Sequence, residues 1–228
     1  MAVSNRVAGV RGARFLGHNR SMRRLLILFL AALTPLAAAE PGWTSLFNGK
    51  DLTGWQPNEH PETWHVVDGA IVAHGDRSHC FYTGDFHNHV FRNFELKVDV
   101  KAAHNSNGGV YILTEFQPEG WPGKGFEVQV NNTYNSDPRK TGSLYEVQDV
   151  HEQLVPDNQW FTEDITVKGD TITVKVNGKQ VVNWTQPADW KGTGDFAGRR
   201  INPGTIALQR HDPGSTVYYK NIRIRLLD

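Results

Sequence analysis

Short segments in which apolar and polar residues alternate recur along most of the chain. In residues 94–100, Phe, Leu and Val alternate with Glu, Lys and Asp, and residues 222–226 alternate Ile and Leu with Arg. Successive side chains of a β-strand point to opposite faces, so this period of two predicts strands with one apolar face. From such alternation and from runs of β-branched and aromatic residues, we expect strands at 94–100, 108–113, 125–131, 165–167, 172–176, 180–184, 206–211 and 217–226.

Turn residues separate these segments. Asp68-Gly69 lies within residues 64–72, and Asn177-Gly178 lies between two of the expected strands. Both pairs suit the positive φ angles of a tight primed turn, so each predicts a β-hairpin. No long stretch has the period of a helix. The pattern therefore predicts an all-β fold, a two-sheet antiparallel jelly-roll sandwich.

The first 39 residues differ in composition from the rest of the chain. They contain six Arg and no acidic residue, and they end in an apolar run, residues 25–36, followed by Ala37-Ala38-Ala39. A basic region, a short apolar region and small residues at a cleavage site are typical of a secretory signal peptide. A membrane anchor is the alternative, but the run is short for a bilayer span. Met22 stands directly before Arg23-Arg24 and is an alternative start, which would make the residues before it an artefact.

Cleavage after Ala39 would leave one domain, residues 40–228, in the periplasm or outside the cell. The whole chain has 24 Lys plus Arg and 24 Asp plus Glu, and the loss of six Arg leaves 18 against 24, a net charge of −6. No basic surface remains to neutralise phosphates, which argues against a nucleic-acid partner. The same cleavage predicts no stable insertion in a membrane. The single cysteine, Cys80, cannot form an intramolecular disulfide.

Several expected strands carry polar or aromatic side chains on the face opposite their apolar residues. The side chains that this parity places away from the core are Tyr111, Glu127, Gln129, Asn131, Gln209 and His211. Any one of them alone is usually just a solvated residue. Asn has low β-propensity, however, and amides on two strands indicate a role other than strand formation. If the strands are neighbours, they form a polar groove with aromatic edges, which suits a sugar.

Seven motifs follow one another in a fixed order. They are LFNGKDLTGW at 46–55, NGGVY at 107–111, GFEVQV at 125–130, TGSLY at 141–145, VNGK at 176–179, IALQRH at 206–211 and YKNIR at 219–223. In this order they resemble the bacterial 3-keto-disaccharide hydrolase family over residues 43–226. Two departures stand out: Asp212 occupies a position where that family usually has Gly, and residues 74–89 are longer and richer in His than its usual pattern.

The resemblance implies a concanavalin A-like fold and an exported enzyme that cleaves glycosides already oxidised to a ketone at C3. A C3 carbonyl acidifies the proton on C2, so a base can remove it and the glycosidic oxygen at C1 can leave by β-elimination, after which water adds. This chemistry needs a general base, an acid for the leaving oxygen and a donor or metal for the enolate. We expect Glu127 and His211 in the catalytic roles. The residues expected to bind sugar hydroxyls are Asn107, Tyr111, Gln129, Asn131, Tyr145, Gln209 and Arg210.

The histidine-rich segment suggests a possible divalent metal ion as cofactor. His79, His87 and His89 lie close in sequence to Asp76 and Asp85, and imidazole with carboxylate suits a transition metal that would polarise a ketone. Their spacing matches no strong metal motif, so polar loop histidines remain the alternative. For the whole chain, a non-catalytic carbohydrate-binding module and a structural interaction module also remain open, because fold does not fix function.

Overall fold

A computed structural model describes residues 40–192 and 196–228. The expected signal peptide, residues 1–39, lies outside these described residues, so its cleavage remains a prediction. In the described part of the chain, the search for a helix long and apolar enough to cross a membrane finds none. The 3-10 helices η1 (Pro61–Thr63) and η2 (Phe86–His89) accompany the strands in this part of the chain.

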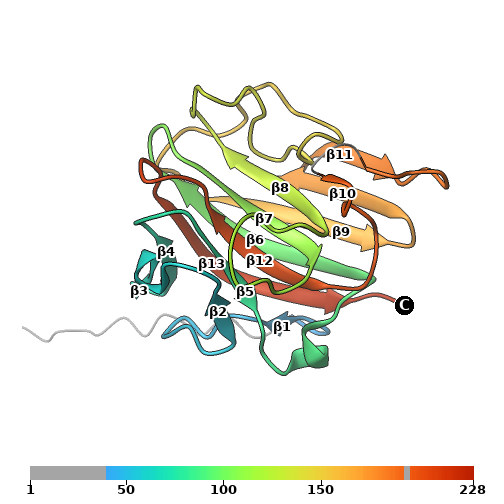
Figure 1. The fold of residues 1–228 in the computed structure, drawn as a ribbon, viewed down its shortest axis with the longest axis horizontal. Helices are drawn as coiled ribbons and strands as arrows, with labels where there is room; N and C mark the ends of the chain where they lie inside the picture. The colour runs from blue at the N-terminus through green and yellow to red at the C-terminus, as the bar shows by residue number, and fades with distance from the viewer. Residues whose placement is uncertain (1–39, 193–195) are drawn as a thin grey trace, which may run out of the picture. The chain divides into compact units, whose positions relative to one another are not determined.

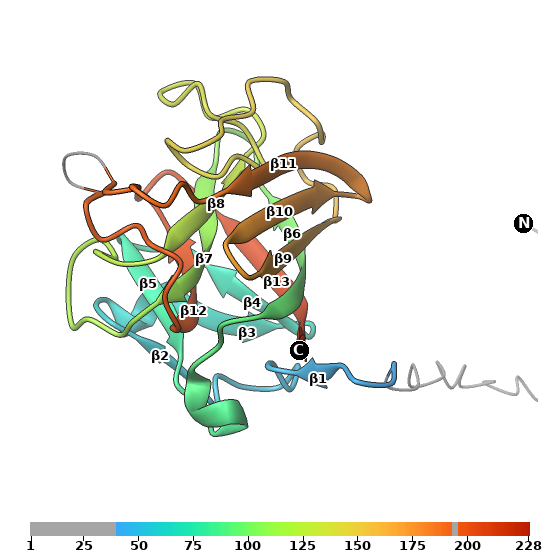
Figure 2. The ribbon, with the colours of Figure 1, turned by 90° about the vertical axis from the view of Figure 1, so that its right-hand side faces the viewer.

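The strands of the described domain form two stacked antiparallel sheets (Figures 1 and 2). The eight-stranded sheet has the order β11 (Lys179–Thr185), β10 (Thr171–Val176), β9 (Phe161–Lys168), β6 (Phe94–Ala102), β13 (Val217–Leu226), β4 (Ala70–Ala73), β3 (Trp64–Val67), and β1 (Thr44–Ser45) pairs with β13. The five-stranded sheet has the order β2 (Trp55–Pro57), β5 (Ser78–Tyr82), β12 (Thr205–Arg210), β7 (Asn107–Thr114), β8 (Phe126–Asn131). This confirms the predicted two-sheet sandwich.

The eight-stranded sheet follows the predicted alternation closely. Along β6 and β9, buried side chains alternate with partly exposed ones, and the buried set faces the other sheet. Asp68-Gly69 and Asn177-Gly178 both have positive φ at each position and close the expected hairpins. One face of this sheet therefore borders the core, while its other face carries the polar side chains.

The five-stranded sheet is covered on both faces. Every residue of β5, β7, β8 and β12 is buried, whichever way its side chain points. One face packs on the core between the sheets, and the other lies under the loops that follow β7 and β8 and under a segment before β12. The face predicted to be polar is thus sheltered rather than open to solvent, because loops distant in sequence cover it.

One central strand was not expected. Residues 78–82, inside the histidine-rich segment, form β5 between β2 and β12. His79 is consequently neither a loop residue nor exposed; its side chain is fully buried. The sequence of this strand, SHCFY, has a polar first half that obscured its strand character.

Candidate active site

Cross-strand pairing brings the predicted polar residues together on the sheltered face of the five-stranded sheet. Tyr111 of β7 lies opposite Glu127 of β8, and one step along, Gly109 lies between Gln129 of β8 and Gln209 of β12. Directly opposed side chains on one face of a sheet are neighbours, so four side chains from three strands converge. The parity argument from sequence correctly placed these side chains on a common face.

Gly109 leaves the space in which these side chains meet. A Cβ atom built at this position would lie 2.7 Å from Glu127 Oε1 and 2.9 Å from its Cγ. Such separations are far inside van der Waals contact, so any larger residue would displace the Glu127 side chain. The glycine is therefore required by close approach rather than by backbone conformation.

Glu127 is held by hydrogen bonds from both sides. Tyr111 Oη donates to its Oε2 at 2.9 Å. With its amide oriented to satisfy its neighbours, Gln129 Nε2 donates to Oε1 at 3.0 Å and to the carbonyl of Gly108 at 3.0 Å. Gln209 Nε2 in turn donates to Tyr111 Oη at 3.3 Å, which extends the network to β12.

Burial dominates the protonation of this carboxyl group. It raises the pKa of Glu127 from 4.5 to about 7, although the Tyr111 hydrogen bond and the positive charge of Arg199 act in the opposite direction. The cause is that the low-dielectric surroundings disfavour the ionised form. A carboxyl group with this pKa exchanges protons near neutral pH, which is what a general base requires.

A pocket of about 330 Å³ opens above Glu127. Its walls are largely aromatic and its floor is polar, and it is lined by Tyr111, Trp121, Pro122, Gly123, Glu127, Gln129, Tyr145, Phe196, Gln209 and His211. This size lies at the lower end of the range for small-molecule sites. Apolar walls suit the C–H faces of a sugar ring, while the amides and the carboxyl group suit its hydroxyls.

His211 comes directly after β12 and lines the pocket from the side of Trp121, with 5.1 Å between the ring centroids. Its Nδ1 lies 3.1 Å from Asp212 Oδ2. Ser215 Oγ donates to the same carboxylate at 2.7 Å, and the Gly214 amide donates to its other oxygen at 2.9 Å. Asp212, the departure noted in the sequence, therefore fixes the imidazole through Nδ1 and leaves Nε2 available.

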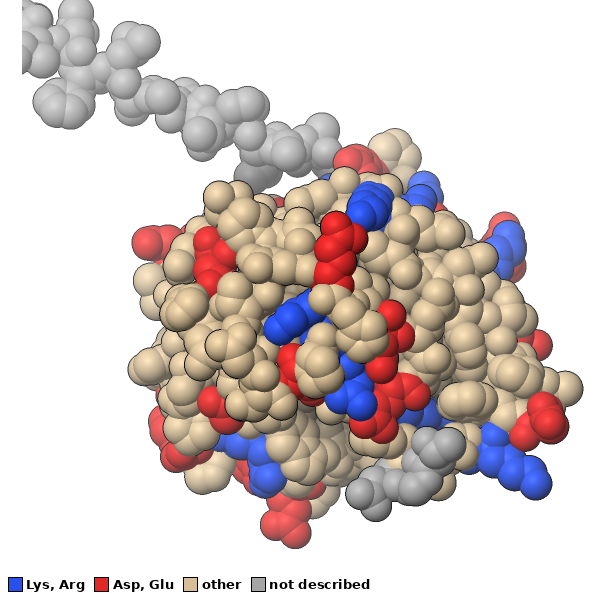
Figure 3. Space-filling model, turned by 90° about the horizontal axis from the view of Figure 1, so that it is seen from above, with Lys and Arg blue, Asp and Glu red and all other residues tan. Residues whose placement is uncertain are grey.

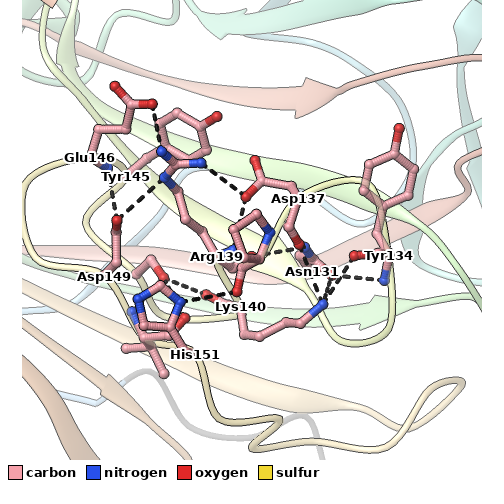
Figure 4. Close-up of polar contacts among 12 residues, drawn as sticks. Asn131, Tyr134, Asp137, Arg139, Lys140, Tyr145, Glu146, Asp149 and His151 are labelled. Carbon is pink, nitrogen blue, oxygen red and sulfur yellow. Dashed lines mark hydrogen bonds and ion pairs between the residues drawn. The ribbon is translucent and has the colours of Figure 1, made fainter.

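The loop after β8 supplies the Tyr145 wall of the pocket, and Arg139 braces it (Figure 4). The Arg139 guanidinium lies over the Tyr145 ring, 4.6 Å from its centroid. Its three nitrogens reach Asp137 at 3.2 Å, Glu146 at 2.6 Å and Asp149 at 3.3 Å. Seen from the side of this loop, acidic and basic side chains lie interspersed on the surface (Figure 3). These ion pairs hold Tyr145 in place.

Arg199 adds a buried positive charge that the sequence did not reveal. It is 5% exposed, and its Nη1 donates to the backbone carbonyl of Tyr145. Its guanidinium stacks on Phe196, 3.6 Å from the ring centroid. Burial lowers the pKa of Arg199, while the negative charge of Glu127 raises it. Trp121, Phe196 and Arg199 all lie in loops without periodicity, so no pattern in the sequence indicated them.

Three predicted substrate-binding residues do not line this pocket. Arg210 alternates with Gln209 along β12 and so points to the opposite face, where it is buried and donates to the Ser215 carbonyl at 3.0 Å. The Asn131 amide nitrogen donates to the carbonyls of Asp137 at 3.0 Å and Arg139 at 2.8 Å, which secures the loop after β8. Asn107 is buried opposite Asn131, away from the pocket.

The three histidines proposed as metal ligands do not come together. His79 is buried on β5, whereas His87 and His89 lie on η2. Among the described residues, only exposed His60, Glu62 and Asp76 form a group of three His, Cys, Asp or Glu whose ligand atoms all lie within 4.8 Å of one another. Sequence proximity misled here because a strand and a turn separate the three side chains in space.

Comparison with known proteins agrees with this geometry. The pattern of the 3-keto-alpha-glucoside-1,2-lyase-like domain matches residues 42–225. The 3-keto-disaccharide hydrolase of Bacteroides thetaiotaomicron is 24% identical, and the match covers 82% of this chain and 79% of that protein.

Solved structures show the same fold. A candidate glycosyl hydrolase from Parabacteroides distasonis superposes with a TM-score of 0.70 at 27% identity, covering 82% of this chain and 94% of its own. The carbohydrate-binding module CBM66 from Bacillus subtilis superposes with a TM-score of 0.52 at 12% identity, covering 77% of this chain and 97% of its own, which shows the fold alone. These likenesses confirm the expected concanavalin A-like sandwich.

Proposed function

The chain belongs to the family of 3-keto-alpha-glucoside-1,2-lyase-like domains, whose relatives are glycosidases, and we propose that it cleaves the glycosidic bond of sugars oxidised to a ketone at C3. The observation that carries this proposal is the buried carboxyl group of Glu127. It lies at the floor of a pocket of sugar size, and its pKa is about 7. A carboxyl group with a perturbed pKa on the floor of a pocket is what proton abstraction next to a ketone requires.

In the proposed reaction, Glu127 takes the proton from C2 and the electron pair of that C–H bond forms the enolate of the C3 ketone. The enolate then expels the glycosidic oxygen from C1, which leaves a double bond between C1 and C2 conjugated with the ketone. His211, fixed by Asp212, gives the leaving oxygen its proton. Water adds to C1 and a proton returns to C2, so the net reaction is hydrolysis.

The remaining pocket residues position the sugar. Gln129 offers an amide group to hydroxyls or to the ketone oxygen, and Tyr145 and Phe196 offer ring faces. The Arg199 charge beside Glu127 favours the anionic states of the reaction. No step of this route requires the histidines of η2.

A non-catalytic carbohydrate-binding module is the second candidate, because the CBM66 module has the same fold and fold does not fix function. The two candidates differ in what Glu127 must do. Binding alone does not need a carboxyl group buried at a cost to stability, whereas proton transfer does. We therefore place the enzyme first.

The deciding experiment incubates the purified protein with a 3-keto-glucoside and with the parent glucoside. We expect cleavage of the keto compound only, and Glu127→Gln serves as the inactive control. Binding of either sugar without turnover would support the binding module instead. Binding of neither would leave a structural role.

The elimination route has its own test in deuterated water. Addition of a solvent deuteron at C2 is expected in the product, because C2 loses its proton and regains one. A product without deuterium at C2 would show direct displacement at C1 and would refute the elimination.

We also propose that the protein works in the periplasm or outside the cell. Support comes from the basic and apolar residues before Glu40 and from the Ala37-Ala38-Ala39 site. N-terminal sequencing of the protein from the producing cells is expected to begin at or near Glu40. Recovery with residues 25–36 intact in a membrane fraction would favour the anchor.

A further inference from the structure

A second polar site lies behind one wall of the pocket. His79 of β5 pairs with Gln209 of β12 across the sheet, so the two side chains are neighbours on the sheltered face. Both are buried, with 0% and 1% of their surface exposed. Among the residues that the structure describes, three of their atoms have no hydrogen-bond partner: Nδ1 and Nε2 of His79 and Oε1 of Gln209.

Three unpartnered polar atoms in one place are unusual, because buried polar groups are nearly always hydrogen-bonded. Burial, followed by the charges of Arg77 and His211, lowers the pKa of His79 to about 3. His79 is therefore neutral at ordinary pH and offers one N–H donor and one acceptor nitrogen. A hydroxyl group, which both donates and accepts, matches that pair.

Trp121 covers His79. The two rings meet edge to face with 5.4 Å between their centroids, and the Arg77 guanidinium lies 5.1 Å from the indole centroid on the outside. Trp121 is nevertheless 44% exposed, which is high for the largest apolar side chain. It thus separates a buried polar floor from solvent without being buried itself.

The loop that carries Trp121 is braced from within. Gln117 Nε2 donates to the carbonyls of Glu119 at 2.8 Å and Trp121 at 2.6 Å, and Gln117 Oε1 accepts from the Gly123 amide at 2.8 Å. These bonds hold residues 117–123 together from within. One further bond, from Asn58 Nδ2 to the Gly120 carbonyl at 3.2 Å, ties the loop to the end of β2. Movement of the loop would break that bond but leave the internal bonds intact.

Resting on the proposed function, we propose that this loop moves aside when substrate binds and that His79 and Gln209 then bind hydroxyls of the second sugar ring, the leaving group of a disaccharide. The position follows from His211, which protonates the leaving oxygen and lies against Trp121. A ring attached to that oxygen lies on the same side, where the indole face covers its C–H face and the floor binds its hydroxyls.

The test uses two substrates with the same 3-keto-glucosyl ring, one with glucose and one with methanol as leaving group. His79→Phe fills the aromatic slot and removes both nitrogens, and His65→Phe, at an exposed position of β3, is the matched control. We expect His79→Phe to raise KM for the disaccharide about 10-fold, equivalent to ~1.4 kcal/mol, and to leave KM for the methyl glycoside unchanged. Its Tm is expected to equal or exceed that of the wild type, since two unpartnered nitrogens are gone.

Equal effects on both substrates, or no effect on either, would overturn the second-ring site. If the wild type turns over neither substrate, the proposed function fails on its own, and calorimetric binding of the two sugars then decides. Disaccharide binding that weakens in His79→Phe, while methyl glycoside binding does not, would uphold the site. Disaccharide binding unchanged in that variant, or absent from the wild type, would refute it.

Discussion

Replacement of Glu127 by Gln is expected to lower activity and to raise stability at pH 8. The substitution keeps the volume and keeps an oxygen that accepts from Tyr111 Oη, which now lies 2.9 Å from the carboxylate. The Gln129 amide, which donates to the other oxygen, can rotate to accept instead, although it then loses its bond to the Gly108 carbonyl. The variant therefore retains most of the network but has no basic group, and we expect kcat to fall at least ~100-fold, the lower end for a general base.

The stability of the same variant is expected to change in the opposite direction. One pKa unit corresponds to about 1.4 kcal/mol. Raising the pKa of Glu127 from 4.5 to about 7 therefore lowers the free energy of unfolding by ~3 kcal/mol when the carboxyl group is ionised in both the folded and the unfolded state. This cost is absent below pH 4.5, grows between pH 4.5 and about 7, and is constant above. Glu127→Gln should then raise Tm at pH 8 by up to ~6–12 °C and leave it unchanged at pH 4.

Two measurements check this reasoning together. Turnover of a 3-keto-glucoside gives kcat, and thermal unfolding at pH 4 and pH 8 gives Tm. In the wild type, kcat/KM should fall about tenfold per pH unit below the pKa of about 7, because only ionised Glu127 accepts a proton. A variant with a near-wild-type rate would exclude Glu127 as the base. A variant that loses stability at pH 8 would show that the carboxylate is better solvated than its burial implies.

Three further substitutions concern Gly109, Asp212 and Glu163. Gly109→Ala should lower kcat at least ~10-fold and affect Tm proportionally less, because its Cβ would displace Glu127, whose Oε1 lies 2.7 Å from that position. Steady-state kinetics measure kcat and thermal unfolding measures Tm; an unchanged kcat would show that the carboxylate adjusts freely. Asp212→Ala should reduce kcat ~10–100-fold on the disaccharide with little change in KM, because His211 loses the partner of its Nδ1. An equal loss of kcat with a substrate whose leaving group needs no proton would rule out His211 as the general acid. Burial raises the pKa of Glu163 well above its usual value, so the Tm of the wild type should fall below that of Glu163→Gln as the pH rises from 4 to 8. Tm values of the two proteins that change in parallel with pH would refute this.

The sequence by itself determined most of the strands and the direction of their side chains. A period of two is visible wherever one face is apolar, so Glu127 and Gln129 could be placed on the face opposite Val128 before the structure was known. Asx-Gly pairs fixed the two hairpins in the same local way. Parity also shows why the motif neighbour Arg210 faces away from Gln209, although the resemblance had grouped the two residues.

Only the tertiary structure decided how these side chains are covered. Trp121, Phe196 and Arg199 reach the pocket from loops that carry no periodic pattern, and their contacts join residues far apart in the sequence. The sequence predicts His79 as a metal ligand or a loop residue because its strand begins with polar residues, yet pairing with β12 buries it beside Gln209. The pKa of Glu127 belongs to the same class of property. A carboxyl group titrates near pH 7 here because the surrounding elements exclude water from it, and that exclusion exists only once the chain has folded.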